Sequence, residues 1–390
     1  MIVKRTIIQH LKKMLKQFPI VSVTGPRQSG KSTLARKMFP EKHYVSCEDP
    51  DTLLFARQDP RGFLKTYENA VIDEAQKVPE IFSYIQAVVD QRDQPGQFIL
   101  TGSSDFLLFE KISQSLAGRT AVLRLLPFSL GEIFPSHPRE DYEDYLFTGF
   151  YPRIYKMGIP AQDFYPGYVQ TYVERDVRSV LAVRDLDRFA ACVRLCATRI
   201  GQVVNAASLA GDLGVDAKTV RAWLSVLSAG YIIHLLPPHF SNFGKRITKQ
   251  PKLYFLDTGL ACRLLGIGDS ASLRQHPSWG ALVENWFIAE ALKQTRHSGS
   301  SVSEWYWWRS HDGLEIDLVR DRGGQLYTCE IKASTSPGIA AKTPQRRFAD
   351  IAKERWAGGA LCHLGSDDGT RGMIRHIPWT HSQALAQLGE

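Results

Sequence analysis

Short apolar runs alternate with longer amphipathic stretches through the first third of the chain. Each run has the length and the residue types of a buried strand. The expected strands are Ile20–Thr24, Tyr44–Ser46, Ala70–Asp73, Phe98–Thr101 and Val122–Leu125. Strands that alternate with helices predict a parallel sheet with helices on both faces, so the fold class is α/β.

The pattern becomes helical after about Arg139 and returns to strands near the C-terminus. Three helical stretches and one strand are expected in the middle: Phe189–Val203, Ala206–Leu213, Ala217–Leu227 and Lys252–Leu256. A long helix from Gly280 and three strands follow: Trp305–Arg309, Glu315–Arg320 and Leu326–Lys332. These changes predict three domains, at residues 1–138, 139–275 and 276–390.

Composition adds three expectations. The net charge of +8 favours an anionic partner such as DNA, although a generic basic surface would give the same value. The six cysteines form neither a CxxC pair nor a Cys/His metal frame, as expected of reduced thiols in a cytoplasmic protein. No apolar run approaches the ~20 residues of a membrane span, so no membrane partner is expected.

The segment GPRQSGKST carries the most specific chemistry. It fits G-x-x-x-x-G-K-[ST] between an apolar strand and a helix, where backbone N–H groups and a helix N-terminus cradle phosphates. Lys31 would reach the β- and γ-phosphates, and Ser32, or its neighbour Thr33, would hold Mg²⁺. The residues expected to bind ATP here are Gly25, Pro26, Arg27, Gln28, Ser29, Gly30, Lys31, Ser32 and Thr33.

Three later motifs extend the expected ATPase site. In AVIDEAQ, Asp73 would order the Mg²⁺ water shell and Glu74 would polarise the attacking water, unless both are solvated acids at a helix start. In FILTGSS, Ser103 or Ser104 would orient that water. In LAGRT, Arg119 would act in trans on the γ-phosphate of a neighbouring subunit, or is a structural surface arginine.

The middle region contains a helix–turn–helix pattern around Gly214. Its second helix would expose Lys218, Thr219 and Arg221, and a following loop with Lys245, Arg246 and Lys249 would form a basic wing. This winged helix could contact DNA phosphates. It could equally serve only for packing or oligomer contacts.

The segment EIDLVRDRGGQLYTCEIK predicts a hairpin that turns at Gly323-Gly324. A turn there places Asp317 opposite Glu330 and Glu315 opposite Lys332, all on one face. Asp317 and Glu330 would bind Mg²⁺ or Mn²⁺, and Lys332 would position an attacking water. A cross-strand ladder of salt bridges is the alternative.

These motifs together resemble a known family. The stretch GPRQSGKST…VIDEAQ…LTGSS…LAGR…LPFSLGE is similar to the AAA-type ATPases. With YVERDV (Tyr172–Val177), YFLDTGLA, GALVENWFIAEAL, EIDLV and EIKAS, nearly the whole chain resembles a bacterial and archaeal family of ATP-binding proteins with a C-terminal domain of unknown function. The resemblance implies a homo-oligomeric ring of six or seven subunits.

The last segments also resemble the PD-(D/E)XK nuclease core, which is a restriction-endonuclease-like α/β fold. Asp317 matches its first acid, Glu330 and Lys332 match its second motif, and Glu284 matches its helical acid. Ile316 stands where that core usually has proline.

Two functions follow from these patterns. The first is an Mg²⁺-dependent ATPase coupled to DNA binding and metal-dependent DNA cleavage, in repair, recombination or defence. The second is an ATP-dependent oligomeric switch whose nuclease-like domain only binds DNA or a protein partner. A motor acting on protein substrates is less favoured, because the sequence shows no aromatic pore-loop pattern.

Overall fold

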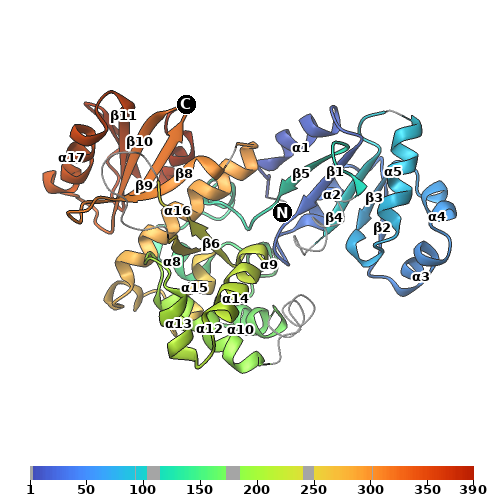
Figure 1. Cartoon of the computed structure of the whole chain (residues 1–390), viewed down its shortest axis with the longest axis horizontal. Helices are drawn as coiled ribbons and strands as arrows, with labels where there is room; N and C mark the ends of the chain where they lie inside the picture. The colour runs from blue at the N-terminus through green and yellow to red at the C-terminus, as the bar shows by residue number, and fades with distance from the viewer. Residues whose placement is uncertain (1–2, 93, 103–114, 173–184, 240–249, 301) are drawn as a thin grey trace.

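The computed structural model describes residues 3–92, 94–102, 115–172, 185–239, 250–300 and 302–390. Figure 1 shows a sheet flanked by helices in the N-terminal third, a helical region in the middle and a second sheet near the C-terminus. Of the segments singled out in the sequence, Ser103, Ser104, most of YVERDV and the wing cations Lys245, Arg246 and Lys249 lie outside the described residues.

The first sheet has five parallel strands in the order β2-β3-β4-β1-β5. Its strands are β1 (Ile20–Thr24), β2 (His43–Ser46), β3 (Ala70–Asp73), β4 (Phe98–Gly102) and β5 (Thr120–Arg124). All five predicted strands are confirmed to within two residues at each end. Because β1 lies between β4 and β5, the loop after β1 leaves the middle of the sheet beside the carboxyl ends of β3 and β4.

Helices cover both faces of this sheet, as predicted. One face packs on α1 (Ile7–Leu15) and α2 (Lys31–Met38), through side chains such as Ile7 and Leu34. The other face packs on α4 (Pro60–Thr66) and α5 (Ile81–Arg92), with α3 (Pro50–Gln58) preceding them. Alternate residues of one strand separate these two cores: Ile20 belongs to one and Val21 to the other.

The middle region is a stack of helices that ends in a two-stranded sheet. The helices are α7 (Leu130–Ile133), α8 (Tyr142–Thr148), α9 (Pro152–Met157), α10 (Ala161–Tyr172), α12 (Leu186–Thr198), α13 (Ala206–Leu213), α14 (Ala217–Ala229) and α15 (Thr258–Leu264). The antiparallel pair β6 (Ile233–Leu236) and β7 (Lys252–Phe255) lies between α14 and α15.

The helix–turn–helix pattern is confirmed at the level of its elements. Gly214 ends α13 in the left-handed conformation, and the Asp216 carboxylate caps α14. The side chains of Lys218 and Arg221 are exposed, and that of Thr219 is partly buried. The preceding helix, α12, was expected to run from Phe189 to Val203, but it begins at Leu186 and ends at Thr198, because the chain turns at Gly201 with a φ of 72°.

The C-terminal region is built on a six-stranded sheet in the order β12-β13-β11-β10-β9-β8. The long helix α16 (Trp279–Ser298) precedes β8 (Trp305–Arg309), β9 (Glu315–Arg322) and β10 (Gln325–Lys332), which form an antiparallel meander. The remaining elements are α17 (Thr343–Ala352), β11 (Trp356–His363), β12 (Gly369–Arg371) and β13 (Ile374–Pro378). Strand β11 runs parallel to both β10 and β13.

Short 3₁₀ segments connect several of these elements. They are η1 (Ala75–Lys77), η3 (Leu273–Gln275), η4 (Val302–Glu304), η5 (Ile339–Lys342), η6 (Lys353–Arg355) and η7 (Trp379–Gln387). The predicted hairpin register is confirmed: Gln325 pairs with Arg322, and the ladder continues in step to Cys329 and Leu318. Gly323 and Gly324 have φ values of 62° and 87°, as the tight turn requires.

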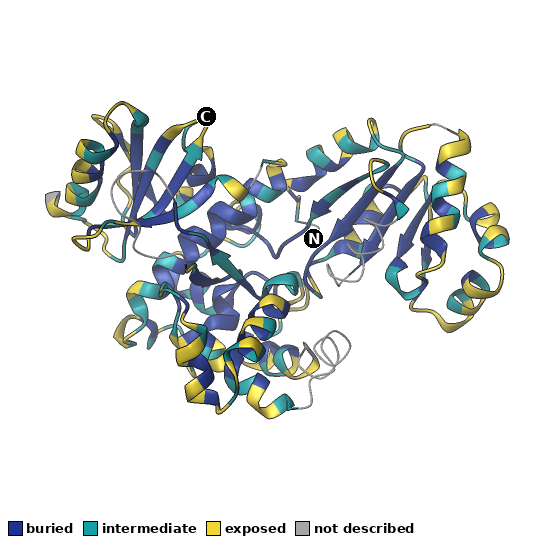
Figure 2. Cartoon of the chain, viewed as in Figure 1, coloured by how far each residue is buried: buried dark blue, intermediate teal, exposed yellow. Residues whose placement is uncertain are grey.

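One hydrophobic core extends through the middle and C-terminal regions, from Leu126 to Leu385. Its centre is α16, which Figure 2 shows as mostly buried. Even the charged residues Glu290 and Lys293 of this helix are fully buried. The boundary proposed at 275/276 therefore divides two regions that share a core, and all three domain limits stay predictions.

Among the described residues, no helix has the length and apolar character needed to cross a membrane.

Candidate functional site

The loop between β1 and α2 has the conformation that a phosphate cradle requires. Gly25 has a φ of 148°, and a Cβ at this position would collide with the carbonyl oxygen of Leu125. Gly30 has a φ of 94° and caps α2. Only glycine fits both positions without strain. The backbone then enters α2 with the first N–H groups of the helix directed toward the loop.

Lys31 and Ser32 occupy the positions expected from the motif. The Lys31 ammonium is buried and donates to the carbonyl oxygens of Gly25 and Pro26, each at 2.9 Å. The Ser32 hydroxyl donates to Asp73 Oδ1 at 3.0 Å, which unites the two expected Mg²⁺-binding groups. The neighbouring Thr33 is exposed, so the contacts favour Ser32 over Thr33 as the Mg²⁺-binding residue.

Asp73 has two further partners that the sequence analysis missed. The Tyr44 hydroxyl donates to Asp73 Oδ2 at 2.7 Å, and the Thr101 hydroxyl donates to Asp73 Oδ1. Burial, and then the adjacent Asp73, raises the pKa of the Tyr44 hydroxyl. Thr101 could have been identified from the sequence. It stands at the end of the apolar run FILT, which is the next expected strand after the one that ends in Asp73.

Glu74 follows Asp73 in a strained conformation. Its φ of 53° is uncommon for a residue with a side chain. The Gln76 amide donates to Glu74 Oε2 at 2.5 Å, which fixes the direction of the carboxylate. Backbone strain of this kind is often retained where a side chain must be aimed at a reactant. The role of Glu74 as the residue that polarises water stays a prediction.

A cleft of about 1010 Å³ opens over the loop and is strongly basic. Besides the loop and Glu74, segments from α1 and α9 line it. The lining cations are Lys4, Arg5, Lys12, Arg27, Lys31, Lys37, Arg153 and Lys156. Several of them lie far from the motif in sequence, so the motif alone could not predict them. Such a cleft attracts a polyanion such as a nucleoside triphosphate.

Arg119 lies at the amino ends of the strands, whereas this cleft lies at their carboxyl ends. Its carbonyl oxygen accepts from the N–H of Ile20, the first residue of β1, whereas the phosphate loop follows the last residue of β1. The two ends of a five-residue strand are about 13 Å apart. The Arg119 guanidinium pairs with Asp90 on α5 at 2.5 and 2.8 Å. Arg119 therefore does not serve the nucleotide site of its own chain, and its action in trans stays a prediction.

A second group of ionisable residues gathers at the hairpin of β9 and β10. It contains Glu315 and Asp317 from β9, Glu330 and Lys332 from β10 and Glu284 from α16. The N–H of Ile331 donates to Asp317 Oδ2 at 2.9 Å, and Lys332 Nζ lies 2.7 Å from Glu330 Oε2 and 4.0 Å from Asp317 Oδ2. We call these five residues, with Lys252 below, the acidic cluster.

The cluster differs from the sequence prediction in one respect. Glu315 was expected to face Lys332, but it pairs with Lys252 of β7 and with Arg309 of β8. Lys252 is buried and also lies 3.5 Å from Glu284, whose carboxylate accepts from the Tyr254 hydroxyl at 2.6 Å. The expected Glu315–Lys332 pair is therefore wrong. The cause is a lysine supplied by the middle region, more than sixty residues away in sequence.

Burial raises the pKa values of three acids of the cluster, Glu284, Asp317 and Glu330, and repulsion between neighbouring acids adds to it. Burial, and then the charge of Asp317, raises the pKa of Glu284 to about 7 and that of Glu330 to about 8. Burial also raises the pKa of Asp317, although Lys332 and Lys252 oppose it. For Lys332, the neighbouring acids outweigh burial and raise its pKa. The cluster therefore carries protons near neutral pH that a bound cation would displace.

Comparisons with known proteins place the chain in a family. Family models match three consecutive segments: an AAA domain at residues 17–134, and domains of unknown function named DUF8612 and DUF4143 at residues 139–271 and 279–381. Two mycobacterial proteins, the uncharacterized protein Rv2008c of Mycobacterium tuberculosis and the uncharacterized protein Mb2031c of Mycobacterium bovis, are each 33% identical over 366 residues. The match covers 92% of this chain and 80% of each relative. This chain belongs to their family.

The AAA match and the phosphate loop make this family member a P-loop ATPase. Among solved structures, the Walker-type ATPase PABY2304 of Pyrococcus abyssi is similar at 16% identity and a TM-score of 0.46, over 66% of this chain and 93% of that one. AMPPCP-bound DnaA from Aquifex aeolicus is similar at 12% identity and a TM-score of 0.29, over 57% and 85%. Scores this low transfer no function.

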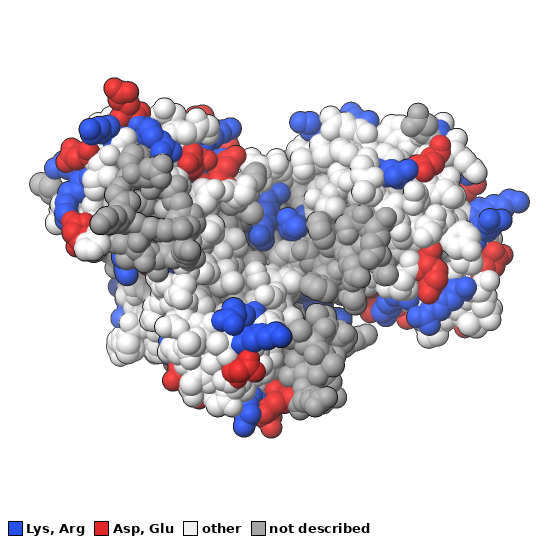
Figure 3. All heavy atoms as spheres, in the orientation of Figure 1, with Lys and Arg blue, Asp and Glu red and all other residues white. Residues whose placement is uncertain are grey.

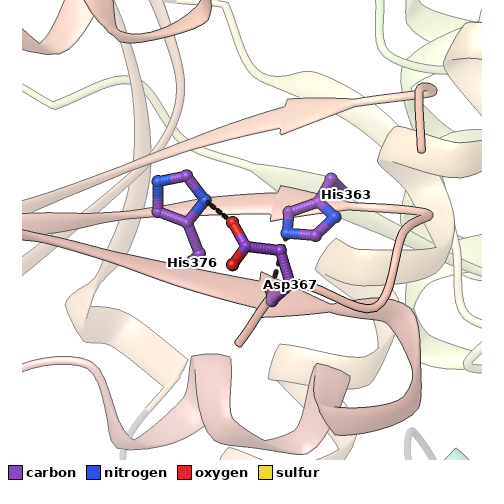
Figure 4. Close-up of side chains that lie close together, drawn as sticks. All are labelled: His363, Asp367 and His376. Carbon is purple, nitrogen blue, oxygen red and sulfur yellow. Dashed lines mark hydrogen bonds and ion pairs between the residues drawn. The ribbon is translucent and has the colours of Figure 1, made fainter. Parts of the chain in front are cut away.

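A third polar group in this ATPase, His363, Asp367 and His376, was not found from sequence (Figure 4). His363 accepts from the N–H of Gly365 at Nδ1, so its proton lies on Nε2, which faces the carbonyl oxygen of Asp367 at 3.0 Å. His376 Nδ1 lies 3.0 Å from the Asp367 carboxylate. This bonding leaves His363 Nε2 without a lone pair for a metal ion, and it favours a role in fixing the loop between β11 and β12.

The Glu330→Gln variant tests the raised pKa values of the acidic cluster. The pKa of Glu330 is about 8 in the folded chain against an ordinary value of 4.5, so its contribution to stability is present below 4.5 and is lost as the pH rises through 8. We expect the wild type to melt a few degrees below Glu330→Gln at about pH 9 and at nearly the same temperature at about pH 5. Thermal unfolding in chelator at both pH values measures this, and an unchanged difference would contradict it.

Proposed function

We propose that this ATPase acts on DNA, that its acidic cluster binds a divalent metal ion and that the cluster cleaves phosphodiester bonds. The observation that carries the proposal is Glu330. Its side chain is 3% exposed, and its Oε1 atom is buried with no hydrogen-bond partner among the described residues. An orphaned carboxylate oxygen is costly unless a cation or a ligand satisfies it.

The residues of the cluster fit a hard divalent cation. Carboxylate oxygens are the preferred ligands of Mg²⁺ and Mn²⁺, and Asp317 and Glu330 would supply them. Such an ion supplies Lewis acidity and a water of lowered pKa. Lys332, which already lies beside both acids, would orient the attacking water and balance charge. Lys252 would hold Glu284 and Glu315 in place.

The order of elements supports the same proposal. Helix α16 precedes the hairpin of β9 and β10 and helix α17 follows it, which is the placement of helices that the resemblance of EIDLV…EIK to the PD-(D/E)XK core implies. Glu284 lies in the first helix, as that resemblance implies. The Gln345 amide of α17 donates to the carbonyl oxygen of Ala360 in β11 at 2.5 Å, so we assign Gln345 to packing.

DNA as the partner rests on charge and on the helical middle region. The chain carries a net charge of +8, and α14 exposes Lys218 and Arg221 beside the hairpin β6-β7. Three helices and a hairpin in this order are typical of a winged helix. Figure 3 shows basic and acidic side chains mixed over the face viewed, rather than one basic stripe. This mixture favours a few local phosphate contacts over a continuous electrostatic track.

Phosphate contacts by α14 predict a change in salt dependence. If Lys218 and Arg221 each displace a counterion, changing both to Ala should lower the slope of log affinity against log salt by about two. Fluorescence anisotropy with duplex DNA over a salt series measures the slope. The double change of Lys13 and Lys16 to Ala is the matched control, because both are exposed cations, one in α1 and one directly after it. An equal slope in the α14 variant and the wild type would argue for a helix that only packs.

Assembly into a ring is a further part of the proposal. Arg119 and Asp90 are both partly exposed, at the end of the sheet away from the basic cleft. An arginine that acts in trans needs a head-to-tail neighbour, and closed rings are the usual outcome of such contacts. With ATP and Glu74→Gln to block turnover, mass photometry should detect six or seven subunits.

The ring prediction has a matched control in Arg92, the last residue of α5, which pairs with Glu68. Arg119→Ala should shift the mass distribution toward monomers, whereas Arg92→Ala should not. A monomer under all these conditions would remove Arg119 from the ATPase site.

The alternative function is an ATP-dependent switch whose cluster is structural. The ion pairs of Lys332 with Glu330 and of Lys252 with Glu284 and Glu315 favour it, because they neutralise part of the cluster without a metal ion. A gel assay on linear, branched and single-stranded DNA, with Mg²⁺ or Mn²⁺ and with or without ATP, separates the two functions. Binding without cleavage under every condition would favour the switch.

A further inference from the structure

A buried chain of polar contacts begins at the phosphate loop with Arg5. The Arg5 side chain is 6% exposed, and all of its guanidinium nitrogens are engaged. Nη1 donates to the carbonyl oxygen of Ser29 at 3.0 Å, Nη2 donates to that of Leu126 at 2.6 Å and Nε donates to Glu132 Oε2 at 3.1 Å. The guanidinium also lies over the Phe128 ring, 4.8 Å from its centroid. Arg5 thus joins the phosphate loop to the segment that follows β5.

Glu132 continues the chain of contacts. Its carboxylate accepts from the N–H groups of Thr6 at 2.7 Å and of Ser129 at 3.1 Å, as well as from Arg5. Burial would raise the pKa of Glu132, but Arg5, His297 and the two N–H groups outweigh burial and lower it. The carboxylate therefore stays ionised and holds α1 and the start of α7 together.

The contacts then reach α16. His297 Nδ1 lies 3.6 Å from Glu132 Oε1, and His297 Nε2 accepts from the N–H of Leu126 at 3.2 Å. Two more bonds fasten the same helix to the segment: Gln294 donates to the Ser129 hydroxyl at 2.7 Å, and Glu290 accepts from the N–H of Leu130 at 2.7 Å. One face of α16 is thus bonded to the residues that Arg5 connects to the phosphate loop.

We propose that Arg5 is a positioning residue of the ATPase site, and that it transmits the conformation of the phosphate loop through Glu132 and the segment Leu126–Glu132 to helix α16. A nucleotide that moves the Ser29 carbonyl changes one of the three anchors of a rigid, planar group. Because the other two anchors are on the segment bonded to α16, the displacement passes to that helix and not to solvent.

The far end of α16 carries Glu284 of the acidic cluster. Glu284 and His297 are thirteen positions apart, which is about 20 Å along a helix. Asn285 fixes this end to β7 through bonds to the N–H and carbonyl groups of Phe255, at 2.6 and 2.9 Å. The helix therefore links the two sites as one buried element. The inference concerns the ATPase site and α16, so it stands whether or not the cluster cleaves DNA.

Hydrogen–deuterium exchange on the full chain tests this, with and without a non-hydrolysable ATP analogue. In the wild type, the analogue should slow exchange in the phosphate loop, in residues 125–132 and in residues 279–298. In Arg5→Lys, the positive charge still compensates Glu132, but the guanidinium nitrogen that donates to the Ser29 carbonyl is lost. We expect a near-wild-type melting temperature, a roughly tenfold rise in the analogue's Kd and, at saturation, no response in residues 279–298.

A double variant covers the case in which Arg5→Lys does not fold. Arg5→Met with Glu132→Leu removes both buried charges together, so neither is left unpaired. It should bind the analogue at high concentration with a response confined to the phosphate loop. Lys13→Gln on α1 is the control and should match the wild type. A response of residues 279–298 that persists in either variant would overturn the proposal, as would a wild type in which only the phosphate loop responds.

Discussion

We expect Glu74→Gln to bind ATP with wild-type affinity and to hydrolyse it on the order of 10²-fold more slowly, or slower still. Glutamine keeps the size and the contact with Gln76 but cannot accept a proton from water. Phosphate release under saturating ATP measures turnover, and titration with a fluorescent nucleotide measures affinity. Hydrolysis at the wild-type rate would show that Glu74 is not the residue that polarises the water.

Two further variants serve as comparisons for Glu74→Gln. Lys31→Ala should weaken nucleotide binding itself, because Lys31 is the buried cation of the phosphate loop. Glu80→Gln changes an exposed glutamate six residues after Glu74 and should leave both affinity and turnover unchanged. If Glu74→Gln and Lys31→Ala had the same phenotype, the separation of binding from hydrolysis would be wrong.

Asp317→Asn should lower the affinity of the acidic cluster for Mn²⁺ by more than on the order of 10²-fold and abolish DNA cleavage. Loss of a residue that only supports a metal ligand typically costs 10–100-fold, and Asp317 is proposed as a ligand itself. Asparagine keeps the size and can still accept from the N–H of Ile331, so the hairpin should fold. Isothermal titration calorimetry measures the affinity, and a gel assay with linear duplex DNA measures cleavage.

Asp312→Asn is the matched control for this variant. Asp312 is an exposed acid near the start of β9 that pairs with Arg347, outside the cluster. Its loss should change neither metal affinity nor cleavage. If Asp317→Asn behaved like Asp312→Asn, or if the wild type neither bound Mn²⁺ nor cut DNA, the cluster would be a structural network of ion pairs.

The ATPase site could be predicted from sequence because its parts are local or periodic. Lys31 and Ser32 belong to a nine-residue motif between an apolar strand and a helix, and Asp73 ends a later apolar strand. Parallel strands bring their carboxyl ends to the same end of the sheet, so residues that follow strands close together in it lie near one another. Tyr44 was missed because a single tyrosine in a strand is usually a packing residue, and nothing nearby in sequence indicates its bond to Asp73.

The acidic cluster could be predicted only in part, because only some of its contacts are set by a local sequence pattern. The Gly323-Gly324 turn fixes the register of β9 and β10, which pairs Cys329 with Leu318. Continuing that register by one residue on each strand places Asp317 opposite Glu330. Lys252 comes from a strand that no local pattern connects to this hairpin. Strand β11 pairs in parallel with β10 across an intervening helix, and such long-range pairing leaves no turn signal in the sequence.

The most direct measurement is anomalous diffraction from crystals of the full chain soaked in Mn²⁺. We expect a peak within bonding distance of both the Asp317 and the Glu330 carboxylates, with Glu330 Oε1 as one of the ligand atoms, and no such peak in Asp317→Asn crystals. Crystals of the wild type without a peak there, with Lys332 still paired to Glu330, would contradict the central claim that this cluster binds a divalent metal ion.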